Sequence, residues 1–203
     1  MERGPQISFG MELARKATHM GALVIPIGYQ LLGLSRATAL WIMIPVALTM
    51  LLIDISRLRE WAFWRVIGRP TISPIIRHHE HNGDFTGATY ILLSVCLTIG
   101  LFAKPIAIAA IAFIIVGDSF AAIIGRRYGR HKFGRKSIEG SIGCLIGTLL
   151  VASLGPLYGL TLGLAVLGAF VATVTEAIST RIDDNVTVPL ASGLAITIFT
   201  KIC

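Results

Sequence analysis

The chain has 203 residues, of which 54% are hydrophobic and 14% are charged. A soluble domain carries roughly a quarter charged residues, so this composition excludes an ordinary soluble globular protein and predicts an integral membrane protein. The net charge of +7 does not by itself indicate a nucleic-acid-binding protein, because membrane proteins concentrate Lys and Arg in their cytoplasmic loops.

Seven apolar runs, each near the length needed to cross a bilayer, follow one another along the chain. A spanning helix needs about 20 residues, and the shorter third, fifth and seventh runs reach that length when flanking polar residues are included. The sequence therefore predicts an all-α polytopic membrane protein with about seven transmembrane helices in a single domain, 1–203. The runs cover residues 17–34, 37–55, 87–102, 105–125, 138–154, 157–177 and 188–202.

The distribution of Lys and Arg predicts the orientation of these helices. With a cytoplasmic N-terminus, fifteen of the 18 Lys and Arg residues fall on the cytoplasmic side and three fall outside. This bias fits the positive-inside rule for an odd number of spans, so we expect the C-terminus outside. Segment 57–76 mixes aromatic residues with Arg, which predicts either an interfacial helix or a cationic loop with belt aromatics.

Six polar residues lie in or near the predicted spans, all toward the cytoplasmic ends of their helices. Charged groups inside a bilayer cost at least a few kcal/mol and usually mark function. Asp118 lies deepest, about 20 Å along its helix at about 1.5 Å per residue. The alternative is that Asp118 only pairs with a buried Arg. The six residues are His19, Asp54, Asp118, Glu139, Ser141 and Glu176.

The loop 125–141 follows Asp118 and combines six basic residues with spaced glycines. The positive-inside rule alone can explain the six charges. Gly125, Gly129 and Gly134 also separate the cations, so that backbone N–H groups can approach an anion. Ser137 opens the fifth span, where a serine satisfies free N–H groups and a helix N-terminus attracts phosphate. The spacing is neither a Walker A loop nor a GxGxxG motif.

A last polar cluster, between Glu176 and Pro189, contains the adjacent residues Asp183, Asp184 and Asn185. Such oxygens suit Mg²⁺, which takes one or two carboxylates and completes its shell with water and substrate phosphates. The alternative is a solvated polar turn that Pro189 closes.

These motifs resemble the membrane kinase family that contains dolichol kinase, phytol kinase and CTP-dependent diacylglycerol kinase. The resemblance covers most of the chain, which is near the family's minimal core and lacks the extra spans of dolichol kinase. It rests on Arg15-Lys16-x-x-His19, Arg77-x-x-Glu80, Gly87-Ala88-Thr89-Tyr90, Gly117-Asp118-x-x-Ala121, Gly125-x-x-x-Gly129, Lys136-Ser137-x-Glu139-Gly140-Ser141, Glu176 and Asp184-Asn185-x-x-x-Pro189.

The resemblance implies transfer of the terminal phosphate of a nucleotide, typically CTP, to the hydroxyl of a lipid alcohol such as a polyprenol, dolichol, phytol or diacylglycerol. The reaction would use Mg²⁺ at the cytoplasmic face, with no nucleic-acid partner. Asp118 would bind Mg²⁺ or accept the hydroxyl proton. The expected catalytic residues are Asp118, Lys136 and Glu176; the nucleotide-binding residues are Gly125, Gly129, Lys136, Ser137, Glu139, Gly140 and Ser141; the metal ligands are Asp118, Asp184 and Asn185; and the supporting residues are Arg15, Lys16, His19, Arg77 and Glu80.

Two other functions stay open from the sequence. A CTP:lipid-phosphate cytidylyltransferase needs the same Mg²⁺, cationic loop and membrane acids, and it differs by releasing pyrophosphate where a kinase releases CDP. A transporter is expected to place polar groups near the midplane and often to contain inverted repeats. In this chain the polar groups gather at one face and no inverted repeat is found, which favours an enzyme.

Overall fold

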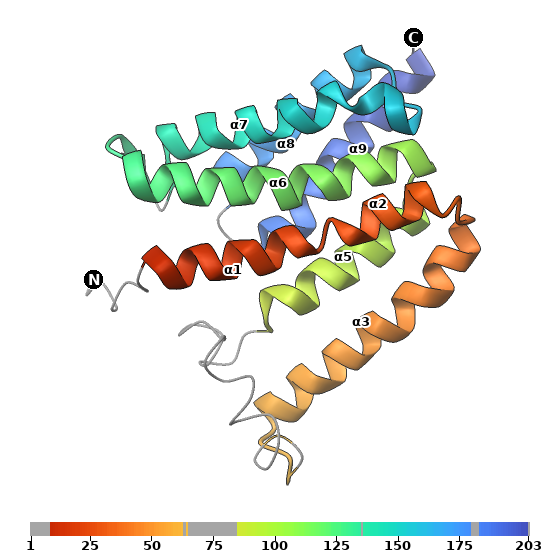
Figure 1. The fold of residues 1–203 in the computed structure, drawn as a ribbon, viewed down its shortest axis with the longest axis vertical. Helices are drawn as coiled ribbons and strands as arrows, with labels where there is room; N and C mark the ends of the chain where they lie inside the picture. Colours follow the sequence, from red (N-terminus) through yellow and green to blue (C-terminus); the bar gives the residue numbers. More distant parts are fainter. Residues whose placement is uncertain (1–8, 63, 65–84, 135, 180–182, 203) are drawn as a thin grey trace.

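The structure is a computed structural model that describes residues 9–62, 64, 85–134, 136–179 and 183–202, without the side chains of residues 9, 11, 12 and 14. The described chain is all-α, as predicted, apart from one short hairpin (Figure 1). Its α-helices are α1 (Phe9–Gly21), α2 (Val24–Leu31), α3 (Arg36–Leu58), α5 (Gly87–Leu101), α6 (Lys104–Tyr128), α7 (Ile138–Ser153), α8 (Leu162–Ile178) and α9 (Asp184–Ile202).

Helix α6 is the centre of the bundle. It contacts α1, α2, α5, α7, α8 and α9, and Figure 1 shows it between α7 and the α1–α2 pair. Fourteen of its 25 residues are buried. Small residues such as Ala107, Ala109 and Ala110, all fully buried, let the neighbouring helices approach closely. A polar side chain in the buried stretch of α6, residues 106–121, is therefore surrounded by protein on most sides.

The helices follow most of the predicted spans. The runs 37–55, 87–102, 105–125 and 138–154 each coincide with one helix, with ends that agree within three residues. Within the described residues, α3, α6 and α9 are long and apolar enough to cross a membrane, and α5, α7 and α8 are shorter apolar helices. The count of seven spans and their orientation stay predictions.

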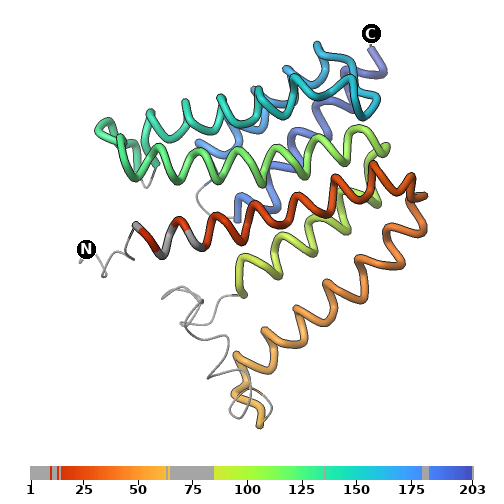
Figure 2. The backbone as a smooth tube through the Cα atoms, viewed as in Figure 1, coloured from red at the N-terminus to blue at the C-terminus, as the bar shows by residue number. Residues whose placement is uncertain are grey.

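Three predicted runs differ from the helices. The run 17–34 is divided into α1 and α2 by a turn at Ala22 and Leu23, although the two helices still lie end to end (Figure 2). The run 157–177 begins as the 3₁₀ turn η4 (Gly155–Tyr158), and α8 starts only at Leu162, because Gly159 adopts a left-handed φ of 85° that no helix continues through.

Helix α9 begins four residues earlier than predicted, at Asp184. The Asp183 carboxylate accepts a hydrogen bond from the Asn185 N–H at 2.9 Å, which satisfies a free donor at the helix start. Pro189 therefore lies inside the helix and does not close a polar turn. The alternative interpretation of this segment as a solvated turn is wrong, because Asn185 is buried.

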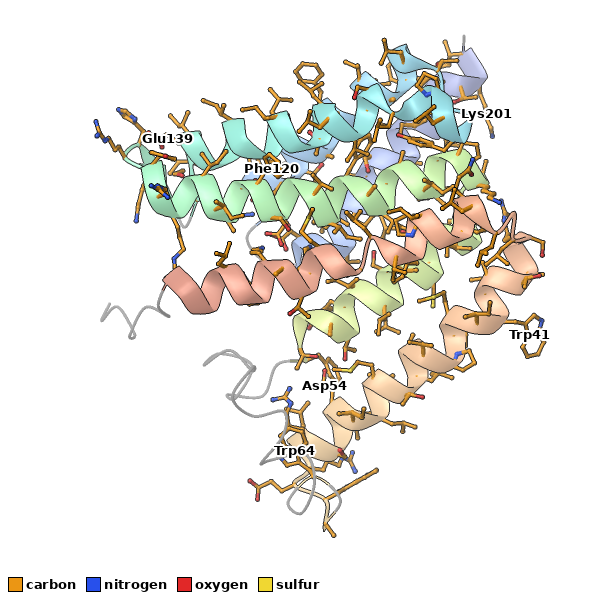
Figure 3. The ribbon with its side chains drawn as sticks, viewed as in Figure 1. Trp41, Asp54, Trp64, Phe120, Glu139 and Lys201 are labelled. Atoms are coloured by element: carbon orange, nitrogen blue, oxygen red, sulfur yellow. The ribbon has the colours of Figure 1, made fainter. Side chains whose placement is uncertain are left out.

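The outer surface of several helices is apolar, as expected for contact with lipid. Trp41 on α3 is 80% exposed, Leu31 on α2 is 79% exposed and Ile202 on α9 is 72% exposed. Figure 3 shows Trp41 pointing away from the bundle. Large apolar side chains this exposed on several helices agree with the predicted membrane protein.

A two-stranded antiparallel hairpin joins α6 to α7, where the sequence predicted only a loop. Strands β1 (Lys132–Phe133) and β2 (Lys136–Ser137) pair with Lys132 opposite Ser137. Gly134 takes the left-handed turn position, with φ of 60°. The Glu139 carboxylate accepts hydrogen bonds from the backbone N–H and the ring Nδ1 of His131, at 3.2 and 2.7 Å. The hairpin therefore fixes the base from which the Lys136 side chain extends.

Candidate active site

The Asp118 carboxylate on α6 is paired with two residues of α1. The Lys16 ammonium donates a hydrogen bond to Asp118 Oδ2, and His19 Nε2 lies 3.4 Å from the same oxygen. Lys16 and His19 stand three residues apart, on one face of α1. The partners of Asp118 are thus a lysine and a histidine, so the alternative in which Asp118 only pairs with a buried Arg is not what the structure contains.

The second oxygen of Asp118 is available for a ligand. Within the described part of the chain, Asp118 Oδ1 accepts no hydrogen bond, and the side chain keeps 17% of its surface exposed where Lys16 keeps 2%. Buried carboxylates normally use both oxygens. One oxygen neutralised by an ammonium and one left accessible is an arrangement that can receive a hydroxyl group or a cation.

A second ionic cluster joins the hairpin to α8 and α9. The Lys136 ammonium is paired with Glu176 Oε1 and lies 3.1 Å from Asp184 Oδ2. Burial alone would lower the pKa of Lys136, but the carboxylates of Asp184 and Glu176 outweigh burial and hold this pKa above its usual value. Lys136 is therefore charged at neutral pH, and in this structure its ammonium is bound by two carboxylates.

The two ionic clusters border the same interior, between α6, α7 and α8. A Cβ on Gly117 would lie 3.0 Å from the Cys144 Sγ of α7. One turn along α7, Thr148 Oγ1 lies 3.2 Å from Thr173 Oγ1 of α8, three residues before Glu176. Asp118 and Glu176 are also within electrostatic range of one another. The fold thus brings acids from α6 and α8 to one region.

Figure 3 labels two other polar residues singled out from the sequence, Glu139 and Asp54. Glu139, beside the hairpin, and Asp54, near the end of α3, are found on one side, and Trp41 and Lys201 on the other. The end that carries Glu139 and Asp54 is the end that the charge distribution predicts to be cytoplasmic. This grouping at one face matches the expectation from the sequence.

The glycines of the predicted nucleotide loop lie where α6 and α7 cross. A Cβ on Gly125 would lie 3.3 Å from the Gly140 Cα, and one on Gly140 would lie 3.1 Å from the Ala121 carbonyl oxygen. Ser137 caps α7, because its Oγ accepts a hydrogen bond from the Gly140 N–H at 3.1 Å. Close packing of α6 against α7 thus explains why glycine occupies these positions. Their contact with a nucleotide stays a prediction.

The predicted metal ligands are divided between the two clusters. Asp118 belongs to the first and Asp184 to the second. Asn185 follows Asp184 on α9, and its amide Nδ2 donates a hydrogen bond to Asp183 Oδ1 at 2.7 Å. No three His, Cys, Asp or Glu side chains converge as a metal site among the residues that the structure describes. A cation nevertheless fits the second cluster, because Glu176 Oε2 and Asn185 Oδ1 are buried and accept no hydrogen bond there, and both are oxygen ligands of the kind that Mg²⁺ prefers.

The other predicted site residues are placed as follows. The Ser141 hydroxyl is buried and has no hydrogen-bond partner within the described residues, so it faces the interior and not the hairpin. Arg15 lies on α1 and is half-buried, next to Lys16. Arg77 and Glu80 lie outside the described residues.

Asp54 has partners that sequence reasoning did not find. Its Oδ2 accepts hydrogen bonds from the Thr86 N–H at 2.8 Å and the Thr89 hydroxyl at 2.6 Å, and its Oδ1 accepts one from Arg57 Nε at 3.1 Å. Asp54 is 1% exposed. Since both oxygens are satisfied, this cluster is a structural link between α3 and α5. The only local signal was the three-residue spacing of Asp54 and Arg57, which puts them on one helix face.

Comparison with known proteins finds relatives over most of the chain. A protein of Rickettsia prowazekii named only as uncharacterized is 32% identical over 199 residues, covering 94% of this chain and 96% of that protein. CTP-dependent diacylglycerol kinase 1 of Saccharomyces cerevisiae is 26% identical over 211 residues, covering 90% of this chain and 71% of that protein.

A chloroplastic farnesol kinase of Arabidopsis thaliana is 36% identical over 143 residues, covering 62% of this chain and 46% of that protein, so the chain spans about half its length. No protein-family model matches the chain. No solved structure matches it either.

Proposed function

The chain belongs to the CTP-dependent lipid kinase family, and on this premise we propose that it transfers the terminal phosphate of CTP to the hydroxyl of a lipid alcohol at the cytoplasmic face of a membrane. It is a phosphotransferase with an alcohol group as acceptor. The observation that carries the proposal is the Asp118 carboxylate, with one oxygen held by Lys16 and the other accessible, beside a second cluster that contains a charged lysine.

The reaction moves one phosphoryl group. The hydroxyl oxygen of the lipid bonds to the γ-phosphorus of CTP, while the bond from that phosphorus to the bridging oxygen breaks and its electron pair leaves with CDP. Catalysis of this kind is mostly positioning and charge neutralisation. When bound, Mg²⁺ would neutralise phosphate oxygens. Asp184 and Asn185 on α9, or Asp118 on α6, are the residues that would hold it.

Asp118 has one of two roles in this proposal. Its Oδ1 either accepts the proton of the lipid hydroxyl or binds the cation, while Lys16 holds Oδ2 in a fixed position. Because Oδ2 is in contact with Lys16 and His19, a substrate would approach the carboxylate at Oδ1. The hydroxyl of a lipid alcohol that enters from the membrane would meet Asp118 Oδ1 on α6.

The triphosphate would lie against the hairpin and the start of α7. Lys136 supplies a positive charge there, and the N-terminus of α7, capped by Ser137, offers backbone N–H groups and a helix dipole that favour phosphate. Glu176 would act through Lys136, because its carboxylate is paired with that ammonium. The acceptor would be a polyprenol, dolichol, phytol or diacylglycerol, whose tail the membrane supplies.

Product analysis tests the proposal. Protein purified in detergent is incubated with Mg²⁺, each of the four nucleoside triphosphates in turn, and a panel of prenols, polyprenols and diacylglycerol. The expected products are phosphorylated lipid and CDP, with CTP preferred over ATP, GTP and UTP. Pyrophosphate release with a lipid-phosphate substrate would instead indicate a cytidylyltransferase. No reaction with any pair would contradict a lipid kinase.

A further inference from the structure

The cluster around Lys136 has more oxygen ligands than its ammonium uses. Lys136 is paired with Glu176 Oε1 and with Asp184 Oδ2. Glu176 Oε2 and Asn185 Oδ1 are buried yet accept no hydrogen bond within the described residues. A buried acceptor without a donor costs free energy, and both side chains are more than nine-tenths buried. These two unused oxygens indicate that something other than Lys136 also binds here.

The chemistry of the unused oxygens points to a divalent cation. Mg²⁺ binds through one or two carboxylates, with amide oxygens, waters and substrate phosphates completing its shell. Glu176, Asp184 and Asn185 supply two carboxylates and one amide oxygen. The Lys136 ammonium compensates one of the two carboxylate charges of Glu176 and Asp184, whereas a divalent ion in its place would compensate both.

Lys136 is more accessible to solvent than Lys16 is. Its side chain is 23% exposed and Asp184 is 26% exposed, so solvent reaches the pair. Lys136 extends from a two-residue strand that follows the left-handed turn at Gly134. Lys16, whose ammonium binds Asp118, differs from Lys136 in exposure and in location. It is 2% exposed and lies within the helix α1. The second cluster is therefore the one in which a cation can be exchanged.

We propose that Lys136 is the resident cation of a divalent-metal site formed by Glu176, Asp184 and Asn185. In the nucleotide-free protein its ammonium takes the place of the metal. With Mg²⁺ and CTP bound, Glu176 and Asp184 would hold the metal, and the Lys136 ammonium would be free to neutralise phosphate charge. The movement of the Lys136 ammonium from the carboxylates to the phosphates rests on the proposed kinase function. The competition between Lys136 and a metal for the same oxygens does not.

Binding of Mn²⁺ alone, followed by electron paramagnetic resonance without nucleotide or lipid, tests the competition. Wild-type protein in detergent is expected to bind Mn²⁺ weakly. Lys136→Met should bind it more tightly by about tenfold or more, because removing the ammonium leaves two carboxylates uncompensated. Lys132→Met is the matched control, since it removes the same charge from the other strand of the hairpin, and it should leave Mn²⁺ affinity unchanged.

The increase in Mn²⁺ affinity of Lys136→Met must also depend on the proposed metal ligands. In the double variant Lys136→Met/Glu176→Gln, the increase in Mn²⁺ affinity should be lost. Unchanged affinity in a folded Lys136→Met protein, or a gain that survives Glu176→Gln, would overturn the proposal. If Lys136→Met does not fold, Lys136→Gln gives the same comparison, and Glu176→Gln alone must still weaken Mn²⁺ binding to the wild-type chain. Loss of kinase activity alters none of these measurements, so the two proposals fail separately.

Discussion

Lys16 and Asp118 are 102 residues apart in the chain, and their charged groups meet across the contact between α1 and α6. Lys16 is 2% exposed, so its ammonium has little access to water. Breaking a buried ion pair by removing one partner is costly, because the remaining charge is left uncompensated. The pair therefore does two things: it fastens α1 to the central helix and it holds one oxygen of Asp118.

The first prediction concerns this pair. Lys16→Met should lower the free energy of unfolding by about 3–5 kcal/mol, because it strands the Asp118 charge inside the bundle. The double variant Lys16→Met/Asp118→Asn should recover a large part of that loss. Equilibrium unfolding of the four proteins in detergent gives the coupling free energy of the double-mutant cycle. Losses that simply add would show that the two groups do not interact.

The second prediction concerns the link from α3 to α5. Thr89→Val removes the hydroxyl that donates to the Asp54 carboxylate at 2.6 Å, and a hydrogen bond to a charged group contributes about 1.5–3 kcal/mol. Thr98→Val is the control in the same helix, because the Thr98 hydroxyl is buried without a partner among the described residues. Unfolding experiments should find Thr89→Val destabilised by this amount and Thr98→Val unchanged or stabilised. Equal effects would argue against the link.

The third prediction concerns the crossing of α6 and α7. An alanine at Gly140 would place its Cβ 3.1 Å from the Ala121 carbonyl oxygen, whereas an alanine at Gly163 would meet nothing within 4 Å. Gly140→Ala should therefore force the helices apart and destabilise the protein by about 1–3 kcal/mol. Gly163→Ala should be neutral or stabilising, since alanine favours a helix by about 1 kcal/mol over glycine. Thermal unfolding in detergent compares the two, and a tolerated Gly140→Ala would contradict close packing there.

The sequence predicted the elements well where local pattern decides them. The runs 37–55, 87–102, 105–125 and 138–154 matched α3, α5, α6 and α7 closely, because apolar length and helix-start residues are local properties. The predicted helix boundaries were wrong where local backbone geometry determines the start of a helix. The left-handed Gly159 delayed α8, and the cap from Asp183 started α9 early.

Partners of the site residues could not be predicted in the same way. Lys16, Asp118, Lys136 and Glu176 were all singled out, by family resemblance or by membrane position. Their pairing depends on which helices pack together, and residues 102 and 40 positions apart carry no local signal of it. The hairpin was missed because two-residue strands have no measurable periodicity.

The account's central claim is tested most directly by following the γ-phosphate of CTP. Protein in detergent is given CTP labelled at the γ-phosphate, Mg²⁺ and the lipid alcohol that the product analysis identifies. We expect the label in the lipid with wild-type protein and with Ser119→Ala. Among the described residues, the buried Ser119 hydroxyl bonds only to the Ile115 carbonyl of its own helix, at 2.7 Å. Asp118→Asn leaves the Lys16 ammonium without its carboxylate and should destabilise the protein, so transfer is measured per folded molecule, and this rate should fall at least about 100-fold. Near-normal transfer by Asp118→Asn, or label found in pyrophosphate instead of lipid, would contradict the account.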